Sequence, residues 1–508
     1  MQKDRGADDP GSCSTGACVP SFLPILVACF VVAGCTTQPG YMTPDFRTPS
    51  TWSTSSVPAS SPPAEIGDAW WKALADPAID AMVPSALADS PTLAQAVAHM
   101  DEARAVVGAS AAQRLPALGL TAAAGRGRSL ESGPDGGTST GSTASAGLTL
   151  SWELDLFGRV RETVTTARER LAARTADARG VRLALAAEVA DGVLALRGCA
   201  HSLQVQTADI ASRARTLAMT RDRLAAGFVA AVDEARAASG LANARTELAL
   251  RQARCERQVH ALVALTGLQG ADVRERVLGA PGAAAVSFMP EPPLLTLAEP
   301  AAVLAAHPKV MAADREAAAA WADIGVARAA RLPRIDLGAL LTGNWMRAAG
   351  STLHATTWSF AANLAAPLFD GGAGAAGVDA AEARYRASAA LLVQAVRHAA
   401  QEIEVALTDA ASAARRMDTT REAVAAARTT LSATEARWLA GATSLFELED
   451  ARRQFAGAED SAIAARRDRA QAWVALIRAS GNSAEPASFN LVSQPDVLHA
   501  NALPSNPQ

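Results

Sequence analysis

The sequence predicts a mainly α-helical chain with a small β part, organised as a tandem repeat that contributes to an α-helical barrel and a membrane β-barrel. Three observations predict this fold class. Short motifs recur in the same order about 214 residues further along the chain. Each copy contains a very long stretch without proline, at 159–226 and at 378–440. Each copy also contains short runs in which apolar and polar residues alternate, the pattern of a strand with two different faces.

The recurring motifs establish the duplication. The matched segments are 114–116 (RLP) with 331–333 (RLP), 156–157 (LF) with 368–369 (LF), and 223–227 (RLAAG) with 437–441 (RWLAG). A period of roughly 200 residues is too long for a solenoid repeat, so each copy is a larger supersecondary unit. The predicted segments are a signal peptide (1–34), a lipidated Pro/Ser-rich tether (35–63), a first repeat (64–267), a linker (268–300), a second repeat (301–481) and a flexible tail (482–508).

The N-terminal region indicates export and lipid attachment. An apolar run at 22–33 has the length of a signal peptide and is followed by Val32-Ala33-Gly34-Cys35. This tetrapeptide resembles the cleavage box of bacterial lipoproteins, which implies cleavage before Cys35 and lipid on its thiol and its new amino group. The alternative is an ordinary signal peptide with an incidental cysteine.

Within each repeat the elements follow in one order. A first helix at 92–113, or 310–330, ends at a Leu-Pro dipeptide, because proline disfavours helix in the residue before it. Two strands follow, with Gly/Ser-rich loops expected at 129–145 and 346–356. A long helix and a returning helix then form a hairpin that turns at a glycine. The predicted strands are 118–124, 148–154, 335–343 and 358–364.

Composition excludes several classes of function. The chain has 47 Lys+Arg against 51 Asp+Glu, for a net charge of −4, so we expect no nucleic-acid partner. The seven histidines are scattered without the spacing of metal ligands. The glycine cluster at 371–374 lacks the lysine and the βαβ context of a phosphate-binding loop. We therefore expect no enzymatic activity, no cofactor and no bound metal.

The strands point to oligomerisation. In 148–154 and 358–364, apolar residues alternate with small or polar ones, as in strands with one face toward lipid and one toward water. Four strands are too few to close a membrane barrel, and open strand edges are not tolerated in hydrocarbon. Several copies must therefore combine their strands into one cylinder, which the long helices continue as a second, α-helical tube. The polar inner face makes the cylinder a water-filled conduit.

Three motifs place this organisation in a known family. Residues 151–159 (SWELDLFGR), 367–372 (PLFDGG) and the pair Trp70-Trp71 followed by Asp76-Pro77 resemble the TolC-type outer-membrane efflux factors of the lipoprotein (NodT/OprM-like) branch. The resemblance implies a homotrimer with a 12-stranded β-barrel in outer-membrane lipid and an α-barrel in the periplasm. It also implies a periplasmic adaptor and an inner-membrane pump, commonly of the resistance-nodulation-division class, as partners in the export of small molecules.

The two hairpin tips are the candidate functional site. In the family these tips meet the adaptor, so the resemblance assigns adaptor contacts to Arg223, Gly227, Phe228, Val229, Gly441, Ala442 and Thr443. The acidic residues Asp233, Glu447 and Asp450 are assigned to a pore constriction. Asp450 matches a family position whose carboxylate rings the closed pore. The alternative is that all three are acids favoured by the dipole near the start of a helix.

Two cysteines outside the signal region and the lipidation site suggest a crosslink. Cys199 and Cys255 lie at equal distances on either side of Gly227, so an antiparallel hairpin places them at one height. Because the periplasm is oxidising, we hypothesise an interhelical disulfide. The alternative is that both are small buried apolar residues.

Two other functions share part of this pattern. The outer-membrane channel of a type I protein-secretion system has the same fold by resemblance. A structural coiled-coil lipoprotein that links envelope layers is the second alternative, but it needs no strands with a lipid-facing side.

Overall fold

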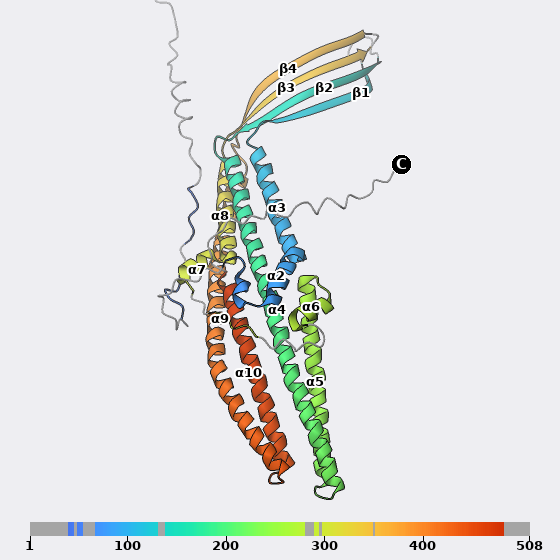
Figure 1. The fold of residues 1–508 in the computed structure, drawn as a ribbon. Helices are drawn as coiled ribbons and strands as arrows, with labels where there is room; N and C mark the ends of the chain where they lie inside the picture. Colours follow the sequence, from blue (N-terminus) through green and yellow to red (C-terminus); the bar gives the residue numbers. More distant parts are fainter. Residues whose placement is uncertain are drawn as a thin grey trace, which may run out of the picture. The chain divides into compact units, whose positions relative to one another are not determined.

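The structure is a computed structural model that describes residues 39–44, 48–53, 67–130, 138–279, 289–293, 297–348 and 351–481. Its described residues form two compact units. The sheet unit contains the described parts of Ser110–Val164 and Ala322–Ala381, and the helical unit contains the described parts of Met42–Ala109, Thr165–Trp321 and the chain from Glu382 to Gly481. The prediction of a mainly helical chain with four strands is confirmed (Figure 1).

The sheet unit contains one antiparallel sheet in the order β1-β2-β3-β4 (Figure 1). The strands are β1 (Ala117–Leu130), β2 (Thr138–Leu154), β3 (Arg334–Ala348) and β4 (Ser351–Ala365). The register aligns Leu120 with Leu148, Leu148 with Leu341, and Leu341 with Trp358. This row therefore brings one apolar residue from every strand to the same face.

The strands are longer than the alternation predicts. The expected loop at 129–145 is wrong at 129–130, which end β1, and from Thr138 onward, where β2 begins; residues 131–137 are not described. The expected loop at 346–356 is strand except for residues 349–350, which are not described. These segments are rich in Ser, Thr and Gly and have no apolar face, so periodicity gives no signal. The backbone ladder forms without an apolar face, since its hydrogen bonds join peptide groups rather than side chains.

The strand-to-helix turns of both repeats use one device. Asp155 accepts hydrogen bonds from the backbone N–H groups of Val160 and Arg161 at 3.0 and 2.9 Å, at the start of helix α4 (Arg159–Ala225). Asp370 accepts from Gly372 and Gly374 at 2.9 and 2.7 Å, at the start of α9 (Ala373–Leu439). The bond from the Gly374 amide, followed by that from Gly372, holds the pKa of Asp370 below its usual range. Each motif thus supplies a carboxylate to unpaired N–H groups of a helix.

Glycines complete these turns. Gly158 has φ 82°, Gly371 has φ 65° and Gly372 has φ 93°, a region that other residues rarely adopt. The motifs that resemble the efflux family therefore have a local structural explanation. They carry the chain from a strand into a long helix within a few residues.

The long helices match the predicted stretches closely. Helix α4 is paired with a returning helix, α5 (Ala231–Thr266), and α9 is paired with α10 (Leu445–Ala479). The first helices of the repeats are α3 (Pro91–Ala112) and α8 (Pro308–Ala329). The proline at position 116 or 333 follows each of them within a few residues, as the Leu-Pro break predicts.

Short helices pack around the middle of the helical unit. They are η1 (Trp70–Leu74), α2 (Pro77–Asp89), α6 (Gly270–Leu278) and α7 (Pro300–Ala306). The linker expected at 268–300 thus contains α6 and the start of α7. A core of apolar side chains joins η1 and α2 to α4, α5, α6 and α10, with the Trp70 ring centroid 6.0 Å from those of both Trp71 and Trp473.

Asp76 is the polar centre of this core. Its side chain is fully buried and caps α2 by accepting from the amide of Ala78 at 2.9 Å. The same oxygen accepts from Nη2 of Arg197 on α4 at 2.9 Å, and Arg197 is only 2% exposed. The buried charges compensate each other, and the pair ties the start of α2 to α4.

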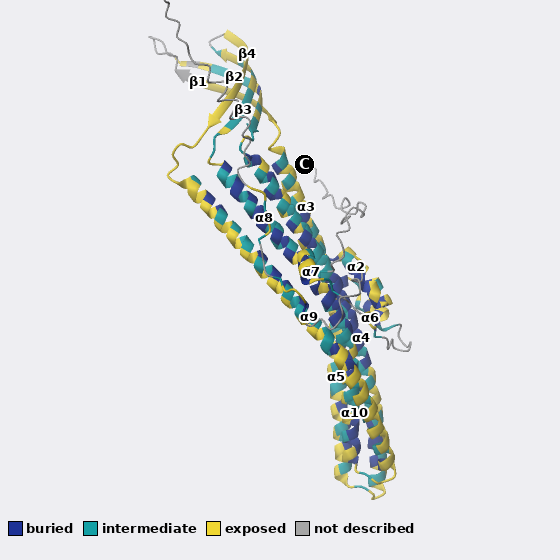
Figure 2. Cartoon of the chain, turned by 90° about the vertical axis from the view of Figure 1, so that its left-hand side faces the viewer, coloured by how far each residue is buried: buried dark blue, intermediate teal, exposed yellow. Residues whose placement is uncertain are grey.

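The helices differ in how much of their surface is buried (Figure 2). In α4, apolar residues such as Val189, Val193 and Leu196 are completely buried, whereas α9 is mostly exposed along its length. The expected tether is held at one point, because Trp52 is 7% exposed in a second core with α9 and its indole Nε1 donates to the carbonyl of Ala298 at 3.0 Å.

Part of the N- and C-terminal predictions lies outside the described residues. These are the signal peptide at 1–34, the lipidation site Cys35 and the tail at 482–508. Among the helices that the structure describes, none is both long and apolar enough to cross a membrane.

Candidate functional site at the hairpin tips

The tips of the two hairpins have the same backbone geometry. Gly227 and Gly441 adopt φ 77° and 73°, directly after the ends of α4 and α9. The amide of Phe228 donates to the carbonyl of Arg223 at 2.8 Å, and the amide of Ala442 donates to Arg437 at 2.8 Å. This is the glycine-dependent end of a helix in which the residue after glycine bonds back to the last turn. The two repeats therefore end their long helices in the same way.

The tips enclose an open cleft of about 420 Å³ in the helical unit. Its lining includes Arg223, Phe228, Val229, Asp233, Gly441 and Thr443 among the residues expected at the tips. Phe228 is 81% exposed at the edge of this region. This side chain is therefore accessible to another molecule at the edge of the cleft.

A cation–π contact joins the two hairpins at the cleft. The guanidinium carbon of Arg223 lies 4.5 Å from the centroid of the Trp438 ring, and Trp438 is only 5% exposed. The same guanidinium donates to the carbonyl of Leu439 at 3.3 Å. Arg223 on α4 therefore both covers the aromatic ring and satisfies the open end of α9.

The three predicted constriction residues lie near the starts of the returning helices. A carboxylate oxygen of Asp233 accepts from the amide of Ala230 at 3.4 Å, and Glu447 pairs with the hydroxyl of Thr443. Asp450 lies one turn further along α10 and accepts from Arg453 at 3.0 Å and from Gln454 at 2.7 Å. Asp233 and Glu447 thus also act as first-turn acids, which is the alternative role, while Asp450 keeps 45% of its side chain exposed.

A buried ionic network lies just above the tips and was not predicted from the sequence. Glu449 on α10 and Arg213 on α4 are 5% and 8% exposed and form an ion pair. Arg452 donates to Glu449 at 3.2 Å and to the hydroxyl of Thr216 at 2.6 Å. Further bonds reach Asp209 on α4 and Glu435 on α9. The network connects three helices, and its central groups Arg213, Glu449 and Arg452 are almost inaccessible to water, whereas Glu435 is partly exposed.

A signal for this network exists in the sequence. Glu449 and Arg452 share the stripe of α10 that contains Leu445 and Leu448, at helical spacings of three, four and seven residues. Charged residues on an apolar stripe indicate burial with a partner, because an unpaired buried charge is too costly. Which residue on α4 pairs with them depends on how the helices are aligned, and the sequence carries no signal for that.

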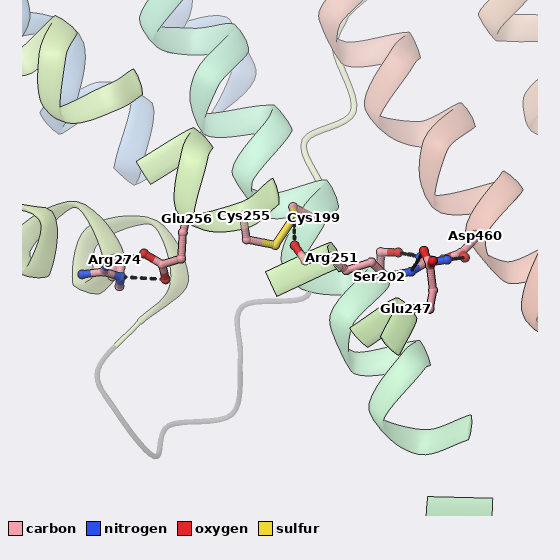
Figure 3. The surroundings of a disulfide bond; sticks show 8 residues. All are labelled: Cys199, Ser202, Glu247, Arg251, Cys255, Glu256, Arg274 and Asp460. Atoms are coloured by element: carbon pink, nitrogen blue, oxygen red, sulfur yellow. Dashed lines mark hydrogen bonds and ion pairs between the residues drawn. A yellow bond between two sulfur atoms is a disulfide. The ribbon is translucent and has the colours of Figure 1, made fainter. Parts of the chain in front are cut away.

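The structure joins Cys199 and Cys255 by a disulfide, with their Cα atoms 5.6 Å apart (Figure 3). Beside it, Arg251 on α5 pairs with Asp460 on α10 at 2.6 Å and with Glu247 at 3.1 Å. The hydroxyl of Ser202 on α4 donates to Asp460 at 2.8 Å. The crosslink and this polar cluster together hold α4, α5 and α10 at one height.

The sheet provides the second part of the candidate site. One face carries large apolar side chains that are strongly exposed, including Leu120 at 74%, Trp358 at 79% and Phe360 at 67%. The other face carries mainly small and polar residues, and its large apolar exceptions are Leu340, Met346 and Leu353. A Cβ on Gly147 would lie 2.9 Å from Oγ1 of Thr342 and 3.5 Å from Oγ1 of Thr121, which shows that these three positions share this face. A face with several large exposed apolar side chains is normally in contact with lipid or with another protein.

The edges of the sheet are also unpaired. β1 pairs only with β2, and β4 pairs only with β3, among the strands that the structure describes. Their outer backbone groups therefore lack partners within one chain, and a sheet in lipid needs such partners. The described residues contain no group of three or more His, Cys, Asp or Glu placed to hold a metal ion.

Comparison with known proteins gives a consistent result. The sequence model of the family described as outer membrane efflux protein matches residues 82–268 and 300–482. The chain is 28% identical over 466 residues to the pyoverdine export outer membrane protein OpmQ of Pseudomonas aeruginosa, covering 90% of this chain and 96% of that protein. It is 26% identical to the probable outer membrane lipoprotein SilC of Salmonella typhimurium, covering 84% of this chain and 90% of that protein.

Solved structures agree with the sequence relatives. The outer-membrane channel OprN superposes with a TM-score of 0.79 and 27% identity, over 88% of this chain and 99% of that one. The similarity therefore extends over both units and is not confined to a shared helical hairpin.

Proposed function

This chain belongs to the outer membrane efflux protein family, and we propose that it is the outer-membrane channel of a tripartite efflux pump. In this role it is a passive conduit that carries small molecules across the outer membrane. Three copies contribute four strands each to a 12-stranded barrel, and the helical unit lies in the periplasm. An export protein and an outer membrane lipoprotein among its relatives support the activity and the location.

The observation that carries this proposal is the four-stranded sheet with two unlike faces and two open edges. In a closed barrel, β4 of one copy pairs with β1 of the next, which satisfies the backbone groups that a single chain leaves open. The apolar face then meets lipid, and the face with Thr121, Gly147 and Thr342 lines a water-filled passage. A coiled-coil lipoprotein needs neither feature, and nothing in the structure favours a protein-secretion channel over efflux.

We propose that the tip cleft receives the periplasmic adaptor. Phe228 provides an exposed aromatic contact, and Gly227 and Gly441 fix the two turns that present it. The remaining tip residues, Val229, Ala442 and Thr443, lie in or beside the same turns. The adaptor in turn connects the channel to an inner-membrane pump.

We also propose that Asp450, with Glu447 and Asp233, contributes to a ring of carboxylates where three copies meet. The partly exposed Asp450 side chain has room for a second role beyond its bonds to Arg453 and Gln454. A ring of three carboxylates at one height favours cations over anions.

Planar-bilayer recording tests the channel and the carboxylate ring. The purified chain is expected to produce uniform single-channel current steps with a preference for cations. Asp450→Asn is expected to weaken that preference. The matched control is Asp418→Asn, which removes an exposed α9 carboxylate that pairs only with the nearby Arg421. Absence of current steps would refute the channel, and an Asp450→Asn variant with unchanged conductance and selectivity would refute the constriction.

A further inference from the structure

Three arginines lie together at the hairpin end of the sheet. The register places Arg126 on β1, Ser142 on β2 and Arg347 on β3 in one row across the sheet. Arg128 lies one row further, and its Nε donates to the hydroxyl of Thr138 at 3.1 Å. All three arginines are exposed.

These arginines share the apolar face. Side chains alternate between faces along a strand, so Arg126 and Arg128 lie on the same side as Leu118 and Leu120. By the same rule Arg347 lies on the side of Leu341. The three side chains therefore point toward the surroundings of the barrel and not into its passage.

Along the strands, these arginines lie where the apolar band of the sheet ends. The apolar rows on this face run from Leu154, at the helix end of β2, to Ala144, which is aligned with Trp345. Ten residues span about 33 Å along a strand, and the usual barrel tilt reduces this to the ~25 Å of an outer-membrane apolar band. The row of Arg126 and Arg347 follows directly, with Trp345 just below it as an interfacial aromatic residue.

No carboxylate of the four strands lies on this face. Their two acidic residues, Glu153 and Asp336, are aligned with each other and with Asn363 on the opposite face. At their helix end, Glu153 pairs with Arg159 at 2.6 Å and Asp336 pairs with Arg334 at 2.8 Å. The described strands thus give Arg126, Arg128 and Arg347 no anionic partner, although each stands where lipid headgroups begin.

We propose that Arg126, Arg128 and Arg347 form a phosphate-binding girdle that holds the phosphorylated glycolipid headgroups of the external leaflet. The guanidinium fork fits phosphate oxygens in pairs, and an arginine at an anionic membrane surface strengthens attachment. The assignment to the external leaflet rests on the proposed function, since the hairpin end lies opposite the strand ends that lead into the periplasmic helices. Repetition in each subunit gives the barrel a belt of positive charge.

The test compares two probes on the full-length protein in dodecyl maltoside micelles. Native mass spectrometry measures binding of diphosphoryl lipid A and of the same lipid after removal of its phosphates. The wild type is expected to bind the phosphorylated form at least 10-fold more tightly, and each arginine is worth about fivefold. The variant R126Q/R128Q/R347Q is expected to lose most of this preference.

Two further variants keep the result interpretable. R104Q/R421Q removes two exposed arginines of the helical unit that pair with Asp101 and Asp418, and it is expected to retain the full preference. S142R adds a fourth arginine to the row and is expected to raise the preference about fivefold.

The proposal is overturned if the wild type shows no phosphate preference, if the triple variant keeps it, or if S142R leaves it unchanged. A chain that conducts no ions would refute the channel, yet the phosphate preference could still be measured in detergent. The failures of the two proposals are therefore distinguishable.

Discussion

The two helical hairpins descend from one duplicated unit, yet they are held in different ways. In the α4–α5 hairpin, a disulfide joins Cys199 to Cys255, and the positions that correspond to them in α9–α10 are Ala413 and Arg469. The α9–α10 hairpin has no such crosslink. Its α10 is instead attached to α4 by the buried charges of Glu449 and Arg452.

The ionic network exists in one copy only. The positions that correspond to Glu449, Arg452 and Arg213 in the other repeat are Ala235, Ala238 and Ala427. A covalent crosslink is permanent in an oxidising compartment, whereas an ionic contact can open and close. The difference teaches that the α4–α5 hairpin is a fixed support and that α9–α10 is attached to it by reversible contacts.

The largest expected effect comes from breaking the ionic network. Arg213→Ala removes one of the two arginines that pair with the buried Glu449 and also the partner of Asp209, and it is expected to destabilise the helical unit by about 3–5 kcal/mol. Thermal unfolding in detergent measures this loss. The variant R213M/E449L replaces both charges with apolar groups and is expected to recover part of it, because Arg452 keeps only Thr216 and Glu435 as partners among those described. If R213A unfolds like the wild type, the network does not hold α10 to α4.

The disulfide is the next test of the comparison. Replacing Cys199 and Cys255 with serine is expected to cost about 2–4 kcal/mol, because the crosslink restricts the unfolded chain. Thiol titration of denatured, unreduced mature protein is expected to find no free thiol at these positions, and two after reduction. Two free thiols before reduction would show that both hairpins lack a covalent crosslink.

A partly buried carboxyl on α4 predicts a pH effect. Burial, only partly offset by Arg478, raises the pKa of Asp191 to about 7. Asp191 therefore stays protonated in the folded chain up to about pH 7, whereas in the unfolded chain it loses its proton near pH 4. The contribution of Asp191 to the free energy of unfolding is fully present below pH 4 and is lost as the pH rises through 7. Its counterpart in the second repeat is Val405, which is 51% exposed.

Asp191→Asn is therefore expected to raise the free energy of unfolding at pH 8 by ~2 kcal/mol. This is about half of what the full shift of the Asp191 pKa would give, because water and Arg478 stabilise part of the negative charge. Unfolding temperatures at pH 5 and pH 8 measure the effect, and the variant is expected to differ less between them than the wild type. Val405→Ala is the matched control and should not change the pH dependence.

The smallest expected effect concerns the starts of the returning helices. Ser444 caps α10 by accepting from the amide of Glu447 at 3.3 Å, and the corresponding residue before α5 is Ala230, whose side chain accepts nothing. Ser444→Ala is expected to cost ~1 kcal/mol, and Ala230→Ser to add a few tenths to 1 kcal/mol. Ser444→Ala is expected to lower the thermal unfolding temperature and Ala230→Ser to raise it. A change of the same sign in both variants would contradict the role of the cap.

Local patterns predicted much of this structure. The proline-free stretches predicted α4 and α9 to within a few residues, and the alternation in 148–154 and 358–364 predicted which side chains share the apolar face. The equal distances of Cys199 and Cys255 from Gly227 predicted that they would lie at one height. In each case the signal lies within one segment or depends on a single turn.

Features that depend on how segments align were not predictable in this way. The outer halves of the strands contain Ser, Thr and Gly on both faces, so periodicity does not extend to them. Arg213 finds Glu449 across 236 residues of sequence, and only the alignment of α4 with α10 brings them together. The row of Arg126 and Arg347 likewise requires the strand register, which alternation in a single strand does not give.

The central claim is that one chain supplies a third of a closed cylinder. Light scattering of the detergent-solubilised protein, with the detergent contribution subtracted, tests this most directly. The predicted protein mass is three times that of the mature chain. A stable species with the mass of one chain, still folded, would contradict the account.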